Sequence, residues 1–139
     1  MPLASETLEA VRAKFDALVR PFEVHPGYKR FATAPTHDGG PHVEHRGQTY
    51  AYVVTERGTE YERRETRDPD ELLYWLVSDT TWEAASQFEL AHRVAGRDSR
   101  RLLFAKHVEL LESIRAEWGS RKRQEYESVL KEHPYNDGA

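Results

Sequence analysis

The apolar positions of the first twenty residues predict an amphipathic helix. They recur at the three- and four-residue spacing that places side chains on one helix face: Leu8, Val11, Phe15, Leu18, Val19 and Phe22. Ser5 is in position to cap this helix, which we expect over residues 6–20, and Pro21 to end it. Prolines and glycines then gather in residues 23–41, which predicts an irregular connection with a short strand at Tyr28–Phe31.

From residue 42 to 67 the period becomes two, and β-branched and aromatic residues dominate the middle of the segment. Glycines at positions 47 and 58 help divide it into three stretches: His42–Arg46, Gln48–Glu56 and Thr59–Thr66. The links are too short for crossover connections, so we expect three antiparallel strands. The third stretch is rich in charge and fits an exposed sheet edge, whereas the middle one is expected to be half buried.

A helical pattern resumes at Asp68 and continues almost to the end of the chain. Asp68 is placed as an N-cap, and proline and acidic residues follow in the first turn. The expected helices end near the breaks at Ser78–Thr80, Gly96 and Gly119, and cover residues 68–77, 81–94, 98–118 and 120–132. The predicted fold is therefore α+β: an N-terminal helix and a small antiparallel sheet of three strands, followed by a mostly helical C-terminal half of four helices.

The length of 139 residues is typical of one domain, and we expect residues 1–139 to form one, with residues 1–67 and 68–139 as its two parts. Apolar residues make up 38% and charged residues 32% of the chain, which fits a well-solvated globular domain. No run approaches the ~18 apolar residues of a membrane span, and the first residues lack the pattern of a signal peptide. We expect a cytoplasmic protein without a membrane partner.

Composition also narrows the chemistry that the chain can perform. The absence of cysteine excludes disulfides, thiol nucleophiles and thiolate metal sites. The formal net charge of −4 disfavours a nucleic-acid partner, and residues 1–67 are balanced, so the whole excess of negative charge lies in residues 68–139. Neither a phosphate-binding glycine loop nor a serine nucleophile motif is present. We therefore expect no catalytic residue and no cofactor.

Three histidines, His37, His42 and His45, lie within nine residues of each other and are the strongest candidates for metal ligands. On a strand, however, His42 and His45 point to opposite faces, and no helical ligand pair accompanies them. A solvated loop and edge strand are the favoured interpretation, so we expect no metal site. A small metal-dependent hydrolase or nuclease that uses His42, His45 and nearby carboxylates is the alternative.

The segment 82–104 begins with a helix that is apolar almost all round and carries Glu89 and Arg93 four residues apart. This pattern predicts a central helix in which these two residues form a partly buried ion pair. Asp98, which is also placed to cap the next helix, and Arg101 are near enough to join them in a structural network. A catalytic role for the four residues is the less favoured alternative, because no nucleophile or glycine-rich loop accompanies them.

Four motifs in the second half of the chain occur in a distinctive order and spacing. They are Glu71–Leu76, the set Ala85, Phe88, Glu89 and Arg93, the run Asp98–Phe104, and the closing Pro134–Asp137. Together they resemble the immunity protein 63 family of bacterial polymorphic toxin systems, over residues 68–137. The resemblance implies a non-enzymatic protein that binds and neutralises a cognate toxin domain in the producing cell. It does not supply toxin-contacting residues.

Carboxylates in the second half are the candidates for contact with such a partner. Glu109 and Glu112 lie opposite the apolar stripe of the 98–118 helix and should face solvent, and Asp79, Glu83 and Glu125 could extend the patch. An acidic face complements the basic clefts of toxins that act on nucleic acids and speeds encounter with them. The alternative interpretation is that these are ordinary solubilising carboxylates. The sequence makes no prediction of oligomeric state.

Overall fold

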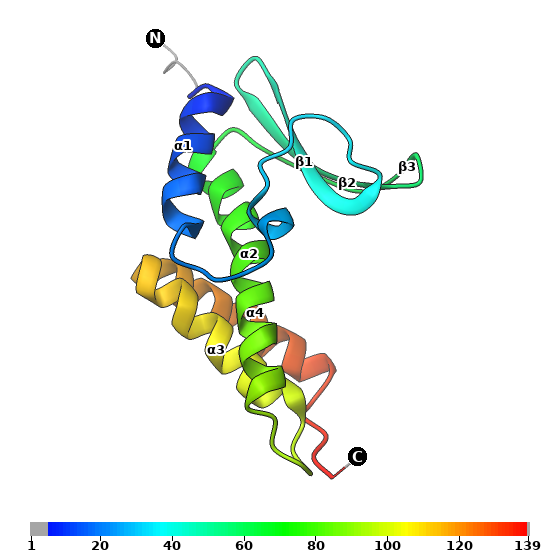
Figure 1. Ribbon diagram of the computed structural model, residues 1–139, viewed down its shortest axis with the longest axis vertical. Coiled ribbons are helices and arrows are strands. Elements are labelled where there is room, and N and C mark those ends of the chain that lie inside the picture. Colours follow the sequence, from blue (N-terminus) through cyan, green and yellow to red (C-terminus); the bar gives the residue numbers. More distant parts are fainter. Residues whose placement is uncertain (1–5, 139) are drawn as a thin grey trace. The chain divides into compact units, whose positions relative to one another are not determined.

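The computed structural model describes residues 6–138, and Figure 1 shows how its helices and strands follow one another. In chain order they are α1 (Leu8–Val19), a short 3-10 helix (Pro26–Lys29), β1 (Asp38–Arg46), β2 (Thr49–Glu56), β3 (Thr59–Thr66), α2 (Pro69–Ala91), α3 (Ser99–Ile114) and α4 (Ala116–Glu132). The predicted α+β class is confirmed, with a helix first, then an antiparallel sheet, then helices. Within residues 6–138, no helix combines the length and apolar character that a membrane span requires.

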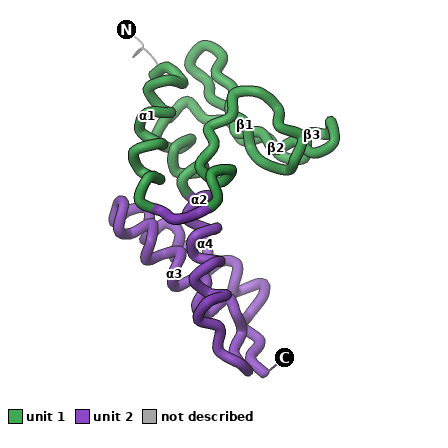
Figure 2. Tube along the Cα trace, viewed as in Figure 1, with its two compact units in different colours: residues 1–21, 25–77 green, residues 22–24, 78–139 purple. Residues whose placement is uncertain are grey.

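The chain divides into two compact units, which Figure 2 distinguishes by colour. The first unit comprises residues 1–21 and 25–77, and the second comprises residues 22–24 and 78–139. The first therefore contains α1 and the sheet, and the second contains α3 and α4. Helix α2 contributes its first part to one unit and the remainder to the other.

Helix α1 follows the predicted pattern, since Val11, Phe15 and Val19 are buried along one face. Its cap is Thr7, whose hydroxyl accepts a hydrogen bond from the backbone N–H of Ala10 at 3.1 Å. The predicted cap, Ser5, lies outside the described residues.

The strand predicted at Tyr28–Phe31 is wrong, because Tyr28 and Lys29 belong to a 3-10 helix that begins at Pro26 and the two residues after them are in no strand. The ring of His25 caps that helix by accepting from the N–H of Gly27, and a proline at the first position suits a helical turn. Phe31 follows the turn and is buried, with its ring 5.9 Å from that of Phe15.

The sheet has the order β1-β2-β3 with both pairs antiparallel, as predicted. Strand β1 begins at Asp38, four residues before the predicted start, and its register shifts between Asp38 and Pro41, where Gly39 has a φ of +85°. β3 is exposed along most of its length, as its charges predicted. β2 is buried at Tyr50–Val53 on both faces, which exceeds the half burial expected of it.

The helix break predicted at Ser78–Thr80 is wrong, because α2 runs through these residues without interruption. Thr80 and Thr81 are buried, and the Thr81 hydroxyl donates to the backbone carbonyl of Ser78 at 3.2 Å. Hydroxyl residues have modest helix propensity, but burial and a satisfied hydrogen bond override it here.

The predicted break at Gly119 is also wrong. The helix ends instead at Arg115, whose backbone is extended, and Gly119 lies inside α4. A Cβ at position 119 would lie 2.6 Å from the Cβ and 2.9 Å from the Cα of Glu112. The glycine therefore serves close packing of α4 on α3 rather than helix termination.

Candidate functional site

The four charged residues expected to form a structural network lie in or beside the turn between α2 and α3. Helix α2 ends at Ala91, and residues 92–98 lead to α3 through Gly96, whose φ of +80° suits glycine. Asp98 caps α3, as predicted, by accepting a hydrogen bond from the backbone N–H of Arg100 at 2.9 Å.

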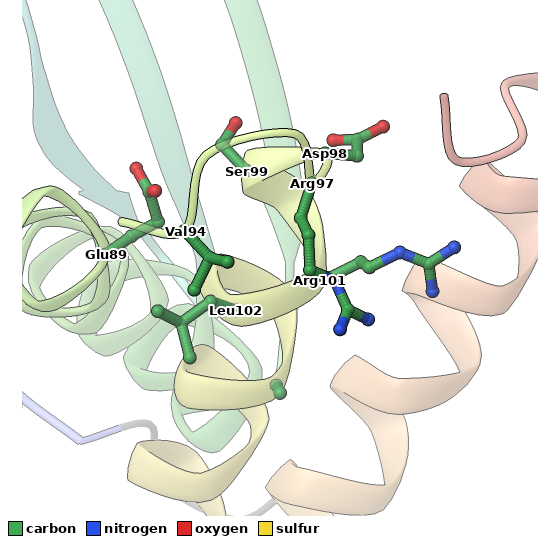
Figure 3. Close-up of a pocket in the computed structure, with 8 residues that line it drawn as sticks. Glu89, Val94, Arg97, Asp98, Ser99, Arg101 and Leu102 are labelled. Carbon is green, nitrogen blue, oxygen red and sulfur yellow. The ribbon is translucent and has the colours of Figure 1, made fainter. Parts of the chain in front are cut away.

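A pocket of about 270 Å³ opens at this turn, within the second unit. Figure 3 shows side chains that line it, among them Glu89, Val94, Arg97, Arg101 and Leu102, and Ala105 lines it as well. The pattern of the helix predicted over 81–94 indicated burial on nearly all sides, and this is wrong for several residues: Leu90 is 64%, Val94 54% and Trp82 39% exposed, and Ala91 is exposed as well. Helix α2 ends at Ala91, so Val94 lies beyond the helix that was expected to reach it.

The ion pair predicted between Glu89 and Arg93 is present, although its two ends differ in exposure. The Arg93 guanidinium donates to both carboxylate oxygens of Glu89, at 2.7 and 3.0 Å. The Glu89 side chain is 5% exposed and that of Arg93 is 57% exposed. These hydrogen bonds lower the pKa of Glu89 below its ordinary value.

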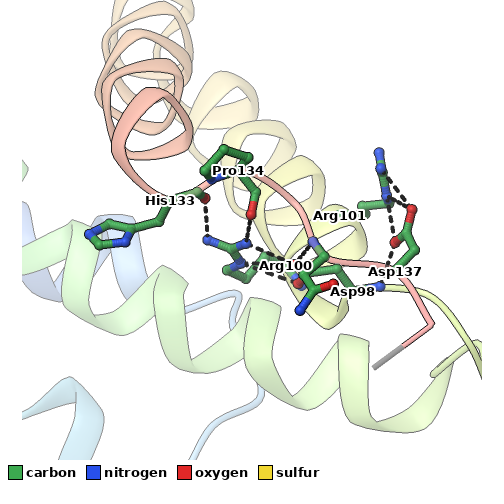
Figure 4. A network of polar contacts seen from close by, with 7 residues as sticks. Asp98, Arg100, Arg101, His133, Pro134 and Asp137 are labelled. Atoms are coloured by element: carbon green, nitrogen blue, oxygen red, sulfur yellow. Dashed lines mark hydrogen bonds and ion pairs between the residues drawn. The ribbon is translucent and has the colours of Figure 1, made fainter.

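Residues 133–138 fold back onto the α2–α3 turn and form with Asp98, Arg100 and Arg101 what we term the C-terminal clasp (Figure 4). Arg100 donates to the backbone carbonyls of His133 and Pro134, both at 2.8 Å. The Asp98 carboxylate accepts from the N–H of Asn136 at 2.9 Å. Together with its Arg100 hydrogen bonds, this contact holds the pKa of Asp98 well below the usual range.

Asp137 completes the clasp from the other side of the turn. Its carboxylate accepts from the backbone N–H of Asp98 at 2.7 Å and pairs with Arg101 at 2.8 Å. Arg101 thus pairs with Asp137, whereas Asp98 pairs with Arg100. The predicted network is therefore divided into separate ion pairs, and sequence reasoning missed Arg100 and Asp137 as its members. The Pro134–Asp137 motif was the available signal, but it does not identify partners more than thirty residues away.

A second polar cluster surrounds His107 in the interior of the second unit. Its Nε2 lies 3.1 Å from the carbonyl oxygen of Ser78 and 2.9 Å from the hydroxyl of Thr81, and its Nδ1 contacts the hydroxyl of Tyr126. A carbonyl only accepts, so the proton lies on Nε2 and Nδ1 accepts from Tyr126. Both ring nitrogens are therefore engaged in contacts that link α2, α3 and α4.

The carboxylates expected to contact a partner lie on three helices of the second unit. Asp79 and Glu83 belong to α2, Glu109 and Glu112 to α3, and Glu125 to α4. Asp79, Glu109 and Glu112 are exposed, and the other two are partly buried.

Three of these carboxylates have basic neighbours. Glu109 lies 3.5 Å from Lys106, Glu112 lies 3.4 Å from Arg123, and Glu125 pairs with both Arg121 and Lys122. The surroundings of these three carboxylates are therefore mixed in charge rather than uniformly negative.

The three clustered histidines have separate surroundings. His42 is buried and its Nε2 lies 3.0 Å from Glu44, while His45 stacks on the ring of Tyr50. His37 accepts from the N–H of Gly58. Among the residues that the structure describes, no three or more histidine, aspartate or glutamate side chains are placed to hold a metal ion. The metal-dependent hydrolase or nuclease considered as the alternative gains no support.

Comparison with known proteins relates the chain to one family. A sequence model of the family described as Immunity protein 63 matches residues 46–128, which is more than half of the chain. The match begins earlier than the expected 68 and takes in β2 and β3, and it ends before the clasp residues 133–138. No curated protein and no solved structure matches the chain.

Proposed function

We propose that this chain, which belongs to the immunity protein 63 family, binds a cognate toxin domain and neutralises it in the cytoplasm of the bacterium that produces both. The family match over residues 46–128 is the observation that carries the proposal. A protein of this kind acts by binding, so we propose no enzymatic activity for it. The helical second unit, with its exposed carboxylates and the pocket at the α2–α3 turn, supplies surfaces on which such a partner can dock.

Co-expression tests this proposal directly. The toxin domain encoded beside the gene is expressed alone, with this chain, and with an empty vector, and growth is followed. We expect growth only when this chain is present, and a stoichiometric complex of the two proteins on size-exclusion chromatography. A toxin that arrests growth equally in the presence of the chain, or two proteins that elute separately, contradicts the proposed function.

We further propose that Asp79, Glu83, Glu109, Glu112 and Glu125 contribute to the encounter with the toxin. Charge reversal at Glu109 and Glu112 together is the sharpest test, because both face solvent on α3. At low salt the association rate constant should fall by about tenfold, since long-range attraction to a basic partner becomes repulsion. Reversal of the exposed Glu127 and Glu132 on α4 is the matched control. An unchanged rate for the Glu109 and Glu112 variant rejects these residues as the contact face.

A further inference from the structure

We infer that the pocket at the α2–α3 turn is the anchor site for the toxin, and that it receives an apolar side chain flanked by a carboxylate. The inference rests on the proposed function and deepens it by naming a surface and the chemistry of the segment that binds there. It involves the second unit alone, since every residue that lines the pocket belongs to that unit.

The apolar part of the argument begins with exposure. Leu90 and Val94 are 64% and 54% exposed, although both are branched aliphatic residues close to one end of α2. Val94 lines the pocket together with Leu102 and Ala105, as Figure 3 shows for Val94 and Leu102. An exposed aliphatic side chain at a pocket that is lined by further apolar residues and bordered by charged ones is typical of a protein contact surface.

The size of the pocket selects the kind of occupant. Its volume of about 270 Å³ is large enough for one bulky side chain and lies at the lower end of the roughly 300–1,000 Å³ range of pockets that enclose whole small-molecule ligands. A large apolar side chain from a partner protein is the better fit, and anchors of this kind contribute much of the binding energy at protein interfaces.

The charges at the turn favour an acidic neighbour for that side chain. Three arginines already have carboxylate partners: Arg93 pairs with Glu89, Arg100 with Asp98 and Arg101 with Asp137. Arg97 also lines the pocket. It forms no ion pair or side-chain hydrogen bond within residues 6–138, although its charge adds to the hydrogen bonds from Arg101 and from the Asp98 N–H that lower the pKa of Asp137.

Arg97 is thus a fourth arginine at a turn whose other three arginines already pair with carboxylates. A partner carboxylate can therefore pair with Arg97 without breaking an existing ion pair.

The C-terminal clasp makes this surface preorganised. The backbone N–H of Gly138 donates to the carbonyl of Gly96 at 2.8 Å, and Asp98 and Asp137 hold the tail on the other side of the turn. A turn that is fixed before binding loses less conformational entropy on association than a flexible one.

The exposed face of α3 continues from the pocket. Ala105, Glu109 and Glu112 follow Leu102 at helical spacing, and all three are exposed. A partner anchored in the pocket therefore reaches the carboxylates already proposed for encounter.

Two substitutions and a matched control test the anchor site. Val94→Glu places a negative charge at the rim of the pocket, and Arg97→Glu reverses the charge that we assign to a partner carboxylate. Val129→Glu is the control, because Val129 is an exposed valine on α4, 40% exposed, outside the pocket. Circular dichroism and urea midpoints establish that each variant is folded. Isothermal titration calorimetry with the toxin domain encoded beside the gene gives the affinities.

We expect Val94→Glu and Arg97→Glu each to weaken binding roughly 30-fold, the effect of losing one interface anchor, and Val129→Glu to bind like the wild type. Wild-type affinity in Val94→Glu overturns the anchor site, and wild-type affinity in Arg97→Glu overturns the acidic partner. A wild-type chain that fails to bind this toxin overturns the proposed function instead, and the inference with it. Sedimentation velocity tests whether a second copy of the chain occupies the pocket instead. A wild-type dimer that becomes a monomer in Val94→Glu would show this and would also overturn the inference.

Discussion

At the level of single residues, the buried His107 makes the stability of the fold depend on pH. Burial in the helical unit, aided by the positive charge of Lys122, lowers the pKa of His107 from 6.5 to about 3. Between these two values the unfolded chain binds a proton that the folded chain excludes. The contribution of neutral His107 to stability is therefore fully present above pH 6.5 and is lost as the pH falls toward 3.

Urea unfolding between pH 7 and pH 4 measures this loss. For the wild type, His107 alone adds a slope of up to about 1.4 kcal/mol per pH unit to the free energy of unfolding. His107→Gln cannot titrate, so we expect a lower stability at pH 7 and a flatter dependence on pH. The exposed His133, changed to Gln, serves as the control and should keep the wild-type slope. An identical slope in His107→Gln contradicts the assignment.

The unequal exposure of Glu89 and Arg93 predicts that their substitutions differ in effect. Arg93→Ala leaves a buried carboxylate without its donor, whereas Glu89→Gln leaves an arginine that water already reaches. We expect the first variant to lower the urea midpoint at pH 7 more than the second. Arg123→Ala, which breaks an exposed pair with Glu112, should change it little. Equal midpoints for Arg93→Ala and Glu89→Gln would show that the burial of Glu89 does not determine how much the ion pair contributes to stability.

The same pair also gives a pH dependence with a definite sign. Hydrogen bonds from Arg93 lower the pKa of Glu89 in the folded chain. The stabilisation is therefore present above the ordinary carboxyl value and is lost as the pH falls below it. The difference in stability between the wild type and Arg93→Ala should shrink in acid.

At the scale of elements, the contact between α3 and α4 depends on Gly119. Replacement of an interior helix glycine by alanine ordinarily stabilises a helix by up to about 1 kcal/mol. Here the added Cβ would meet the backbone of Glu112 at 2.9 Å, which no side-chain rotation relieves. We expect Gly119→Ala to destabilise the protein by about 2 kcal/mol in urea unfolding, and Ser120→Ala, at an exposed neighbour, to have little effect. Stabilisation by Gly119→Ala would mean that the helices can move apart freely.

The elements show which features of the fold a sequence can predict. Periodicity identified the faces of α1 and the three antiparallel strands, because these patterns are local. It failed at Ser78–Thr80 and at Gly119, because contacts with residues distant in sequence decide whether the helix continues there. A glycine that permits close packing and one that ends a helix look alike in a single sequence.

The candidate site shows the same division. The Glu89 and Arg93 pair was predictable because its members lie four residues apart on the chain. The ion pair between Arg101 and Asp137 was not, since 36 residues separate its members and only the folded tail brings them together. The exposure of Val94 was missed for a related reason, because the end of α2 could not be placed to within one turn.

At the scale of the whole molecule, net charge does not describe the surface that a partner meets. The excess of negative charge lies in residues 68–139, yet the α2–α3 turn in that half carries four arginines, three of which pair with carboxylates. Carboxylates such as Glu109 and Glu112 follow along α3 with basic neighbours of their own. The affinity for a toxin therefore depends on matching a pattern of positive and negative charges. Such a pattern contributes more to the specificity of binding than to its affinity.

We expect residues 1–139 to form one domain, and this expectation predicts that the two units unfold together. Helix α2 runs through both, so we predict that neither unit opens globally without the other. Hydrogen exchange tests this through the slowest amides of β2 in the first unit and α3 in the second. Gly119→Ala lies in the second unit and should lower the free energy of exchange of the slowest amides equally in β2 and in α3. Ser120→Ala should leave the exchange of both elements unchanged. A loss confined to α3 would establish two independently unfolding units joined by a shared helix.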